Sequence, residues 1–153
     1  MDPANLRAAV GRASATAVVL LAGCSFAPEG DAPMEAPAEY RAWFARTEAC
    51  SGREGDFDRI RWHVVDGESF ECPSGRCVGR WNNSHDIYIA SVYVRHELVV
   101  RHEMLHELLG RPGHPDPPFG TGCPLTWESW RGAEDTGAAV TGRVVGLGLT
   151  RID

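Results

Sequence analysis

Hydrophobic residues recur at helical spacing in two segments of the chain. Residues 97–109 contain no Gly or Pro, and their leucines fall at helical spacing: Leu98, Leu105, Leu108 and Leu109. Gly110 follows as a helix-ending residue, with Pro112 just beyond it. Residues 39–49 place three aromatic side chains at the same kind of spacing: Tyr40, Trp43 and Phe44. The pattern therefore predicts two helices.

Between these segments the pattern changes to alternation and short apolar runs, which favour β-strands. Three or four strands are expected, over residues 57–65, 69–72, 77–81 and 86–92. Asp66-Gly67 is a hairpin signal that would pair the first two of them. The order of helix, strands and helix predicts an α+β domain in which a short, mostly antiparallel sheet backs the second helix.

The first 23 residues follow a third pattern. Two Arg precede an apolar run from Ala13 to Ala22, and no acidic residue follows Asp2 in this segment. This is the layout of a secretory signal peptide, which is too short to span a membrane. The run ends in Leu21-Ala22-Gly23-Cys24, which resembles a bacterial lipobox. The resemblance implies cleavage before Cys24, lipid attachment to Cys24 and, because Ser25 follows, anchoring in the outer membrane facing the periplasm.

The rest of the chain divides by composition. Residues 24–37 hold three Pro and little to bury, which predicts a flexible tether between the lipidated Cys and a catalytic domain over residues 38–130. Residues 131–153 are expected to be a tail or one last strand. Without residues 1–23 the chain has 13 basic and 20 acidic residues, because that segment holds two Arg and one Asp. A mildly acidic domain is a poor nucleic-acid binder, and we expect a monomer.

Four cysteines remain when Cys24 is set aside, and an even number in an exported domain favours two disulfides. The residues between Cys72 and Cys77 are turn-forming, so a Cys72–Cys77 bond across a hairpin is expected. That leaves Cys50–Cys123. A second zinc site made of Cys is the alternative, which an oxidising compartment disfavours.

Residues 102–106 read His-Glu-Met-Leu-His. On a helix, residues four apart lie on one face, so His102 and His106 can share one metal ion, with Glu103 beside them to take a proton from water. Catalytic zinc sites take three protein ligands and leave a fourth position to water. We favour His114 as the third ligand, because a Gly-containing turn lets the chain return towards the metal. Glu128 and Asp116 are its rivals.

This segment resembles the zincin superfamily of zinc metallopeptidases. The resemblance implies a Zn²⁺ cofactor on His102, His106 and His114, with Glu103 as the general base that cleaves a peptide or protein substrate. By the same analogy residues 87–90 would form the rim of the substrate cleft. The chain departs from the metzincin branch, because Gly110 and His114 are displaced by one and two positions and no Met follows Met104.

Some roles stay open at this level. Zinc would stabilise the oxyanion of the reaction, and three residues are available as further donors, with nothing in the sequence to select among them: Tyr88, Tyr93 and Arg101. His63 and His85 are expected to be surface or hydrogen-bonded residues, and His96, which lies off the metal face of the helix, an N-terminal neighbour rather than a ligand. The alternative function is a non-catalytic zinc-binding envelope lipoprotein, which would keep the histidines but have no need of Glu103. A structural lipoprotein with an accidental motif would bind no zinc.

Overall fold

The computed structural model describes residues 26–132 of the chain. The predicted signal peptide, Cys24 and residues 133–153 of the predicted tail lie outside the described residues. The helices are α1 (Glu39–Ser51) and α2 (Glu97–Leu109), and two 3₁₀ turns are η1 (Phe57–Arg59) and η2 (Ser91–Tyr93). The strands are β1 (Asp31–Pro33), β2 (Arg61–Val65), β3 (Phe70–Cys72), β4 (Gly75–Cys77), β5 (Gly79–Trp81) and β6 (Asp86–Ala90).

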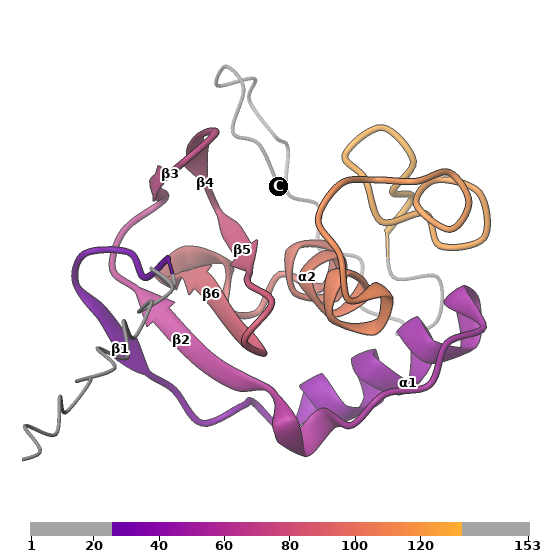
Figure 1. Ribbon diagram of the computed structural model, residues 1–153, viewed down its shortest axis with the longest axis horizontal. Coiled ribbons are helices and arrows are strands. Elements are labelled where there is room, and N and C mark those ends of the chain that lie inside the picture. The colour runs from indigo at the N-terminus through magenta and orange to yellow at the C-terminus, as the bar shows by residue number, and fades with distance from the viewer. Residues whose placement is uncertain (1–25, 133–153) are drawn as a thin grey trace, which may run out of the picture.

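The strands form one mixed sheet and one separate hairpin (Figure 1). The order in the larger sheet is β1-β2-β6-β5, in which β2 and β6 run parallel and the other two pairs are antiparallel. Strands β3 and β4 pair only with each other among the described strands. The predicted small α+β fold is therefore confirmed, and α2 lies between the sheet and α1.

The predicted hairpin at Asp66-Gly67 is wrong. Strand β2 does not turn back onto β3 but lies parallel to β6, with Trp62 opposite Ile87. All five residues of β6 are buried, so this strand needs cover on both faces and neighbours on both edges. That requirement places β6 in the middle of the sheet and overrides the local turn signal.

The position of β6 also corrects the expected cleft rim. Residues 87–90 pair with β2 on one side and β5 on the other, so both edges of this strand are occupied. An extended substrate cannot add to a strand that is paired on both sides. In the part of the chain that the structure describes, β5 is the edge strand of the sheet on the side of α2.

Part of the predicted tether belongs to the folded domain. Asp31–Pro33 forms β1, which pairs antiparallel with the end of β2. The ring of Phe26 meets that of Tyr88 edge-on, and its carbonyl accepts a hydrogen bond from Asn82 at 3.3 Å. These contacts are made by residues far away in the sequence, so the Pro-rich composition of the segment carried no sign of them.

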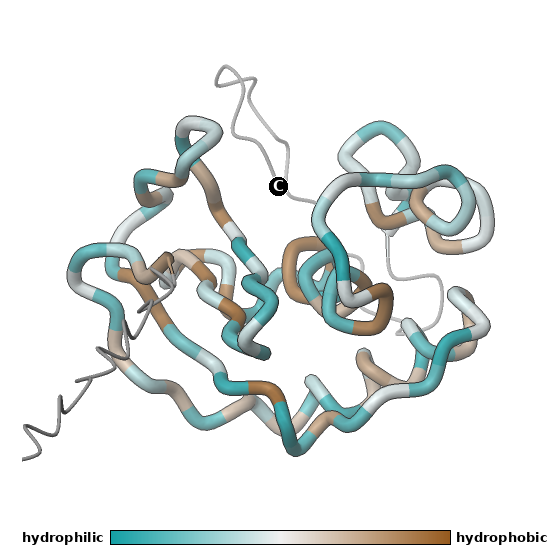
Figure 2. Tube along the Cα trace, viewed as in Figure 1, coloured by the Kyte–Doolittle hydropathy of each residue, from teal (hydrophilic) through white to brown (hydrophobic). Residues whose placement is uncertain are grey.

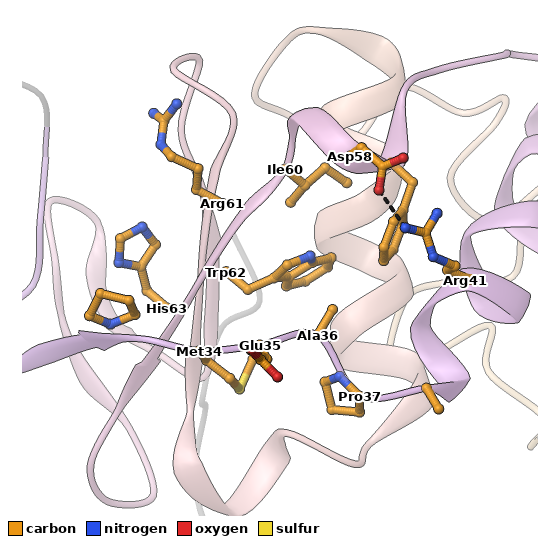
Figure 3. Close-up of a pocket in the computed structure, with 13 residues that line it drawn as sticks. Met34, Glu35, Ala36, Pro37, Arg41, Asp58, Ile60, Arg61, Trp62 and His63 are labelled. Atoms are coloured by element: carbon orange, nitrogen blue, oxygen red, sulfur yellow. Dashed lines mark hydrogen bonds and ion pairs between the residues drawn. The ribbon is translucent and has the colours of Figure 1, made fainter.

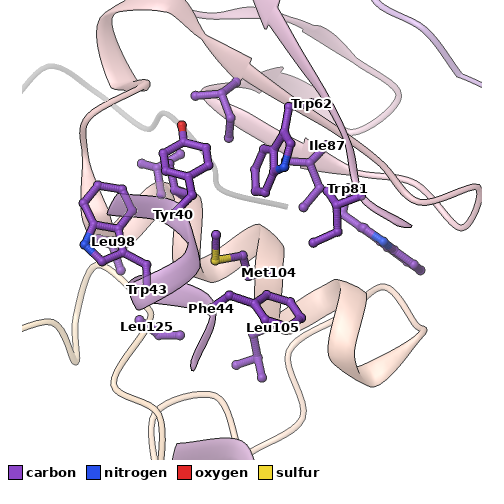
Figure 4. Packing of buried hydrophobic residues seen from close by; sticks show 14 of the residues in the cluster. Tyr40, Trp43, Phe44, Trp62, Trp81, Ile87, Leu98, Met104, Leu105 and Leu125 are labelled. Carbon is purple, nitrogen blue, oxygen red and sulfur yellow. The ribbon is translucent and has the colours of Figure 1, made fainter. Parts of the chain in front are cut away.

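The centre of α2 is buried on every side. All nine residues from Leu98 to His106 are buried, and Figure 2 shows hydrophobic residues over much of this helix. Figure 4 shows the aromatic residues of α1 meeting Met104 and Leu105 of α2, with Trp62 and Ile87 from the sheet completing the core. Burial of this much apolar surface is the main favourable term in the stability of the domain.

The ends of α2 agree with the prediction. The helix stops at Gly110, which adopts the left-handed conformation (φ 61°), and its N–H donates to the carbonyl of His106 at 2.9 Å. Within residues 26–132, neither helix has the length and apolar character needed to cross a bilayer.

Both predicted disulfides are present. Cys50 at the end of α1 is bonded to Cys123, with 5.2 Å between their Cα atoms, and the bond joins residues 73 positions apart. Cys72 and Cys77 are bonded across the β3–β4 hairpin, with 6.0 Å between their Cα atoms.

A group of charged residues joins three strands of the sheet. Asp86 on β6 accepts hydrogen bonds from the Arg61 guanidinium at 2.7 and 2.8 Å and from His63 Nε2 at 3.1 Å. The other ring nitrogen of His63 lies 2.7 Å from Asp31 on β1. Burial alone would raise the pKa of Asp86, but the hydrogen bonds from Arg61, His63 and Asn82 outweigh it and hold this pKa below its usual value.

We expect Asp86→Asn to lower the free energy of unfolding by about 1–3 kcal/mol at pH 7, because a hydrogen-bonded carboxylate is removed from its partners. A depressed pKa stabilises the folded state above the pKa of the unfolded chain, about 4, and this contribution is lost as the pH falls through the folded-state pKa. The difference between variant and wild type should therefore shrink towards pH 3. Urea unfolding at several pH values, monitored by tryptophan fluorescence, measures this difference in the free energy of unfolding.

Asp58→Asn is the matched control. Asp58 also pairs with an Arg, Arg41, but both side chains are exposed, at 73 % and 64 %. An exposed ion pair contributes little, so this variant should leave the free energy of unfolding nearly unchanged. Equal losses for the two variants would contradict the role given to the Asp86 group.

Candidate metal centre

Three imidazoles meet at one point on α2. His102 and His106 come from adjacent turns of the helix, and His114 comes from the loop that follows it. His102 Nε2 lies 2.9 Å from His114 Nε2 and 3.3 Å from His106 Nε2. The ligating atoms of all three residues lie within 4.8 Å of one another, and this set is able to hold a metal ion.

Backbone carbonyls set the orientation of both helical histidines. His102 Nδ1 lies 2.5 Å from the carbonyl oxygen of Leu125, and His106 Nδ1 lies 3.1 Å from that of Arg111. A carbonyl oxygen can only accept, so Nδ1 carries the proton in each ring. In the neutral imidazole this leaves the lone pair on Nε2, the atom that faces the other two histidines.

This tautomer makes the group fit a cation. The Nε2 lone pairs of His102 and His106 face each other across 3.3 Å, an arrangement that is repulsive unless a positive charge lies between them. Four ligands placed tetrahedrally at about 2.0–2.1 Å from zinc are about 3.3–3.4 Å from each other. The separation of the two helical nitrogens matches that value, and the distance of 2.9 Å from His102 Nε2 to His114 Nε2 is shorter than it.

Burial favours the metal-binding form of His102. This side chain is 2 % exposed. Burial, reinforced by the neighbouring His106 and His114, lowers the pKa of His102 well below its usual value, although the hydrogen bond to Leu125 acts in the opposite direction. The ring is therefore neutral at pH 7, as a metal ligand must be.

The structure separates the three candidates for the third position. His114 lies in the group, whereas Glu128 is exposed and outside it. The carboxylate of Asp116 accepts the backbone N–H of Thr121 at 2.9 Å, so it closes a turn within the loop. Among the described residues, only His114 joins the two helical histidines in a ligating group.

Glu103 is fully buried beneath strand β5. Gly79 on β5 lies close to the Glu103 side chain. A Cβ atom at position 79 would lie 2.7 Å from Oε1 of Glu103 and 3.0 Å from its Cγ. Only a residue without a side chain leaves room for the carboxylate at this point. The sequence reasoning missed Gly79, and a Gly within a short β-rich segment was the only signal of a close approach.

Phe119 was also missed. Its ring is 2 % exposed, and its centroid lies 4.9, 4.9 and 4.8 Å from the ring centroids of His102, His106 and His114. One aromatic side chain thus packs against all three imidazoles. It limits their rotation and excludes water from one side of the group.

A second aromatic ring is held against His106. Trp81 on β5 lies nearly parallel to the His106 ring, with centroids 6.2 Å apart and 19° between the planes. Its indole N–H donates to Glu107 at 2.6 Å, and the other oxygen of Glu107 lies 2.6 Å from His85 Nδ1. His85 Nε2 in turn lies 2.7 Å from Arg59. His85 is thus hydrogen-bonded, as expected, and takes part in positioning a residue beside the site.

The candidate oxyanion residues lie elsewhere. Arg101 points to α1, where its guanidinium donates to Thr47 at 3.0 Å, and it also pairs with Glu97. Tyr88 stacks on His63 within the sheet, and Tyr93 packs against His96. All of these contacts are with residues outside the metal centre.

A hollow of about 620 Å³ lies on another part of the surface (Figure 3). It is bounded by the connection from β1 to α1 and by η1 and β2, with Trp62 in its wall and the Arg41–Asp58 pair beside it. None of the histidines of the metal centre lines it. The hollow is therefore separate from the metal centre.

No protein-family model, curated protein or solved structure matches the chain. The three imidazoles, their backbone partners and Glu103 are therefore the features of this chain that bear on its chemistry.

We expect Gly79→Ala to lower the free energy of unfolding by about 1–3 kcal/mol, because the new methyl group overlaps with Glu103 and with Val99. In a Glu103→Ala background the same change should cost less, since Cγ and the carboxylate are gone. A double-mutant cycle measured by urea unfolding gives this coupling. Equal losses in the two backgrounds would show that Glu103 and strand β5 are not in contact.

Proposed function

We propose that this protein is a zinc-dependent hydrolase of peptide bonds, of the zincin type, which acts at the bacterial cell envelope. The observation that carries the proposal is the convergence of His102, His106 and His114, with the lone pairs of the helical pair directed at one point. Glu103, adjacent to His102 in the same helix, supports catalysis over storage of the metal, because a carrier needs no general base there.

The donor set supports zinc as the metal. Imidazole nitrogen is a usual ligand of zinc, whereas magnesium and calcium prefer oxygen ligands. Three protein ligands leave the fourth position of a tetrahedral zinc ion to water or substrate. Bound zinc supplies a Lewis acid and lowers the pKa of a water molecule to about 7.

The residues of the chain take separate parts in the reaction. His102 and His106 would hold the zinc ion through Nε2. The carbonyls of Leu125 and Arg111 accept from Nδ1 of each ring, which keeps Nε2 unprotonated and directed at the metal position. Glu103 accepts the proton from the attacking water and passes it to the amine that leaves. The choice of a peptide bond as the substrate rests on the resemblance of residues 97–114 to zincins.

Two features of the chain support the proposed location. Two disulfides in a domain of this size are typical of an oxidising compartment. The sequence Leu21-Ala22-Gly23-Cys24 after an apolar run supports a lipid anchor at Cys24. Together they favour a domain held by its lipid at the outer membrane. We further propose that this domain is monomeric and acts on a peptide or protein substrate.

We expect Glu103→Gln to abolish hydrolysis while zinc is retained, because the amide cannot accept a proton but has nearly the shape of the carboxylate. His102→Ala should lose both zinc and hydrolysis. Elemental analysis of the purified protein, with cleavage of a generic peptide mixture in the presence and absence of a chelator, measures the two properties. Full activity in the Glu103→Gln protein would refute the role of Glu103.

His63→Gln serves as the control for histidine replacement. His63 bridges Asp31 and Asp86 in the sheet and lies outside the metal group, so this variant should keep its zinc and its activity. The alternative, a non-catalytic zinc-binding lipoprotein, predicts zinc binding without hydrolysis. Wild type would then hold one zinc ion and cleave nothing, and Glu103→Gln would be indistinguishable from it.

A further inference from the structure

The loop after α2 contributes three separate groups to the metal centre. We name residues 110–125 the metal loop. It carries His114 itself, the Arg111 carbonyl that accepts from His106, and the Leu125 carbonyl that accepts from His102. Only the helical histidines therefore belong to a regular element, and the geometry of the whole group depends on where this loop lies.

The metal loop has local structure that holds its own shape. The N–H of Phe119 donates to Pro115 at 3.0 Å, and the N–H of Cys123 donates to Pro118 at 2.9 Å. These bonds are internal to the loop, so they do not determine its position relative to α2. The Phe119 ring packs against the histidines, and besides the main chain itself one covalent bond links the loop to the body of the domain.

That covalent bond is the Cys50–Cys123 disulfide. Cys50 lies in the last turn of α1, and α1 is packed on α2 through buried aromatic residues and through the bond from Arg101 to Thr47. The disulfide thus fixes the metal loop to the same rigid pair of helices that presents His102 and His106. Cys123 is only two residues before Leu125, whose carbonyl orients the buried His102.

We propose that formation of the Cys50–Cys123 disulfide assembles the metal centre, so that the chain binds its metal tightly only after oxidation. The inference rests on the metal site of the proposed function and concerns how that site is regulated. In the reduced chain the main chain still joins the loop to α2 at Gly110, but only non-covalent packing holds the far end of the loop against α1. The Leu125 carbonyl, and with it the course of the loop that carries His114, is then no longer fixed relative to the helical histidines. The hydrolase would then be inactive in a reducing compartment and become active on export.

The oxidation balances as a thiol–disulfide exchange. The Cys50 and Cys123 thiols give up two electrons and two protons to a partner of the disulfide class. One S–S bond forms in this chain, and one S–S bond breaks in the partner, which leaves as a dithiol. The metal does not change its oxidation state in this step.

The second disulfide provides an internal control. Cys72–Cys77 closes the β3–β4 hairpin and packs in a separate small cluster with Val65, Phe70 and Tyr88. Removal of the Cys72–Cys77 disulfide takes one disulfide from the chain but changes no residue of the metal loop, so it controls for the loss of a disulfide as such.

The test measures zinc affinity by competition with a chromophoric chelator, using the oxidised full-length chain in detergent. Cys50→Ser/Cys123→Ser should raise the dissociation constant about 10–100-fold, the size of effect seen when groups supporting metal ligands are removed. Cys72→Ser/Cys77→Ser should stay within about threefold of wild type. Serine is used because free thiols would themselves bind zinc. Equal affinities for the two double variants would overturn the inference.

A second measurement applies if Cys50→Ser/Cys123→Ser fails to fold. The zinc-loaded Cys72→Ser/Cys77→Ser protein, which keeps Cys50–Cys123, is treated with a phosphine reductant in the presence of excess chelator. Zinc should be released as the two thiols appear, while circular dichroism retains its helical signal. Two thiols without zinc release would contradict the inference. If oxidised wild type takes up no zinc at all, the proposed function itself fails.

Discussion

The structure depends on one constraint: the central nine residues of α2 are all buried, and four of them are polar or charged. Burying such groups is unfavourable unless each is satisfied. Arg101 is satisfied from α1 and from Glu97, and its burial lowers its pKa from the usual value. His102 and His106 are satisfied by carbonyls of the following loop. The surroundings of α2 are therefore arranged around its polar residues as much as around its apolar ones.

The same constraint explains which residues around the helix are special. Strand β5 comes so close to Glu103 that a side chain at position 79 is excluded, and two positions later Trp81 covers His106. On the other side Phe119 packs on all three imidazoles. The metal group thus contacts an edge strand and a loop that are distant in the sequence and both lie against α2.

Local signals were enough to predict some of this. The limits of α2 follow from an uninterrupted helical pattern that ends in Gly110, and the His102–His106 pair follows from spacing on that helix. The Cys72–Cys77 bond follows from turn residues between the cysteines. The parallel pairing of β2 with β6 and the strand at Asp31–Pro33 were not predicted, because a strand carries no local mark of its partner.

By itself the sequence determined the helix, the face that carries two imidazoles and an adjacent carboxylate, and the residues able to complete the group. Only the tertiary structure decided that His114 rather than Glu128 joins them, and that Leu125 and Arg111 set the tautomers. The reason is physical: helical spacing is a property of neighbouring residues. The path of a loop back to its helix is decided by long-range packing and, in this chain, by a disulfide that joins residues 73 positions apart.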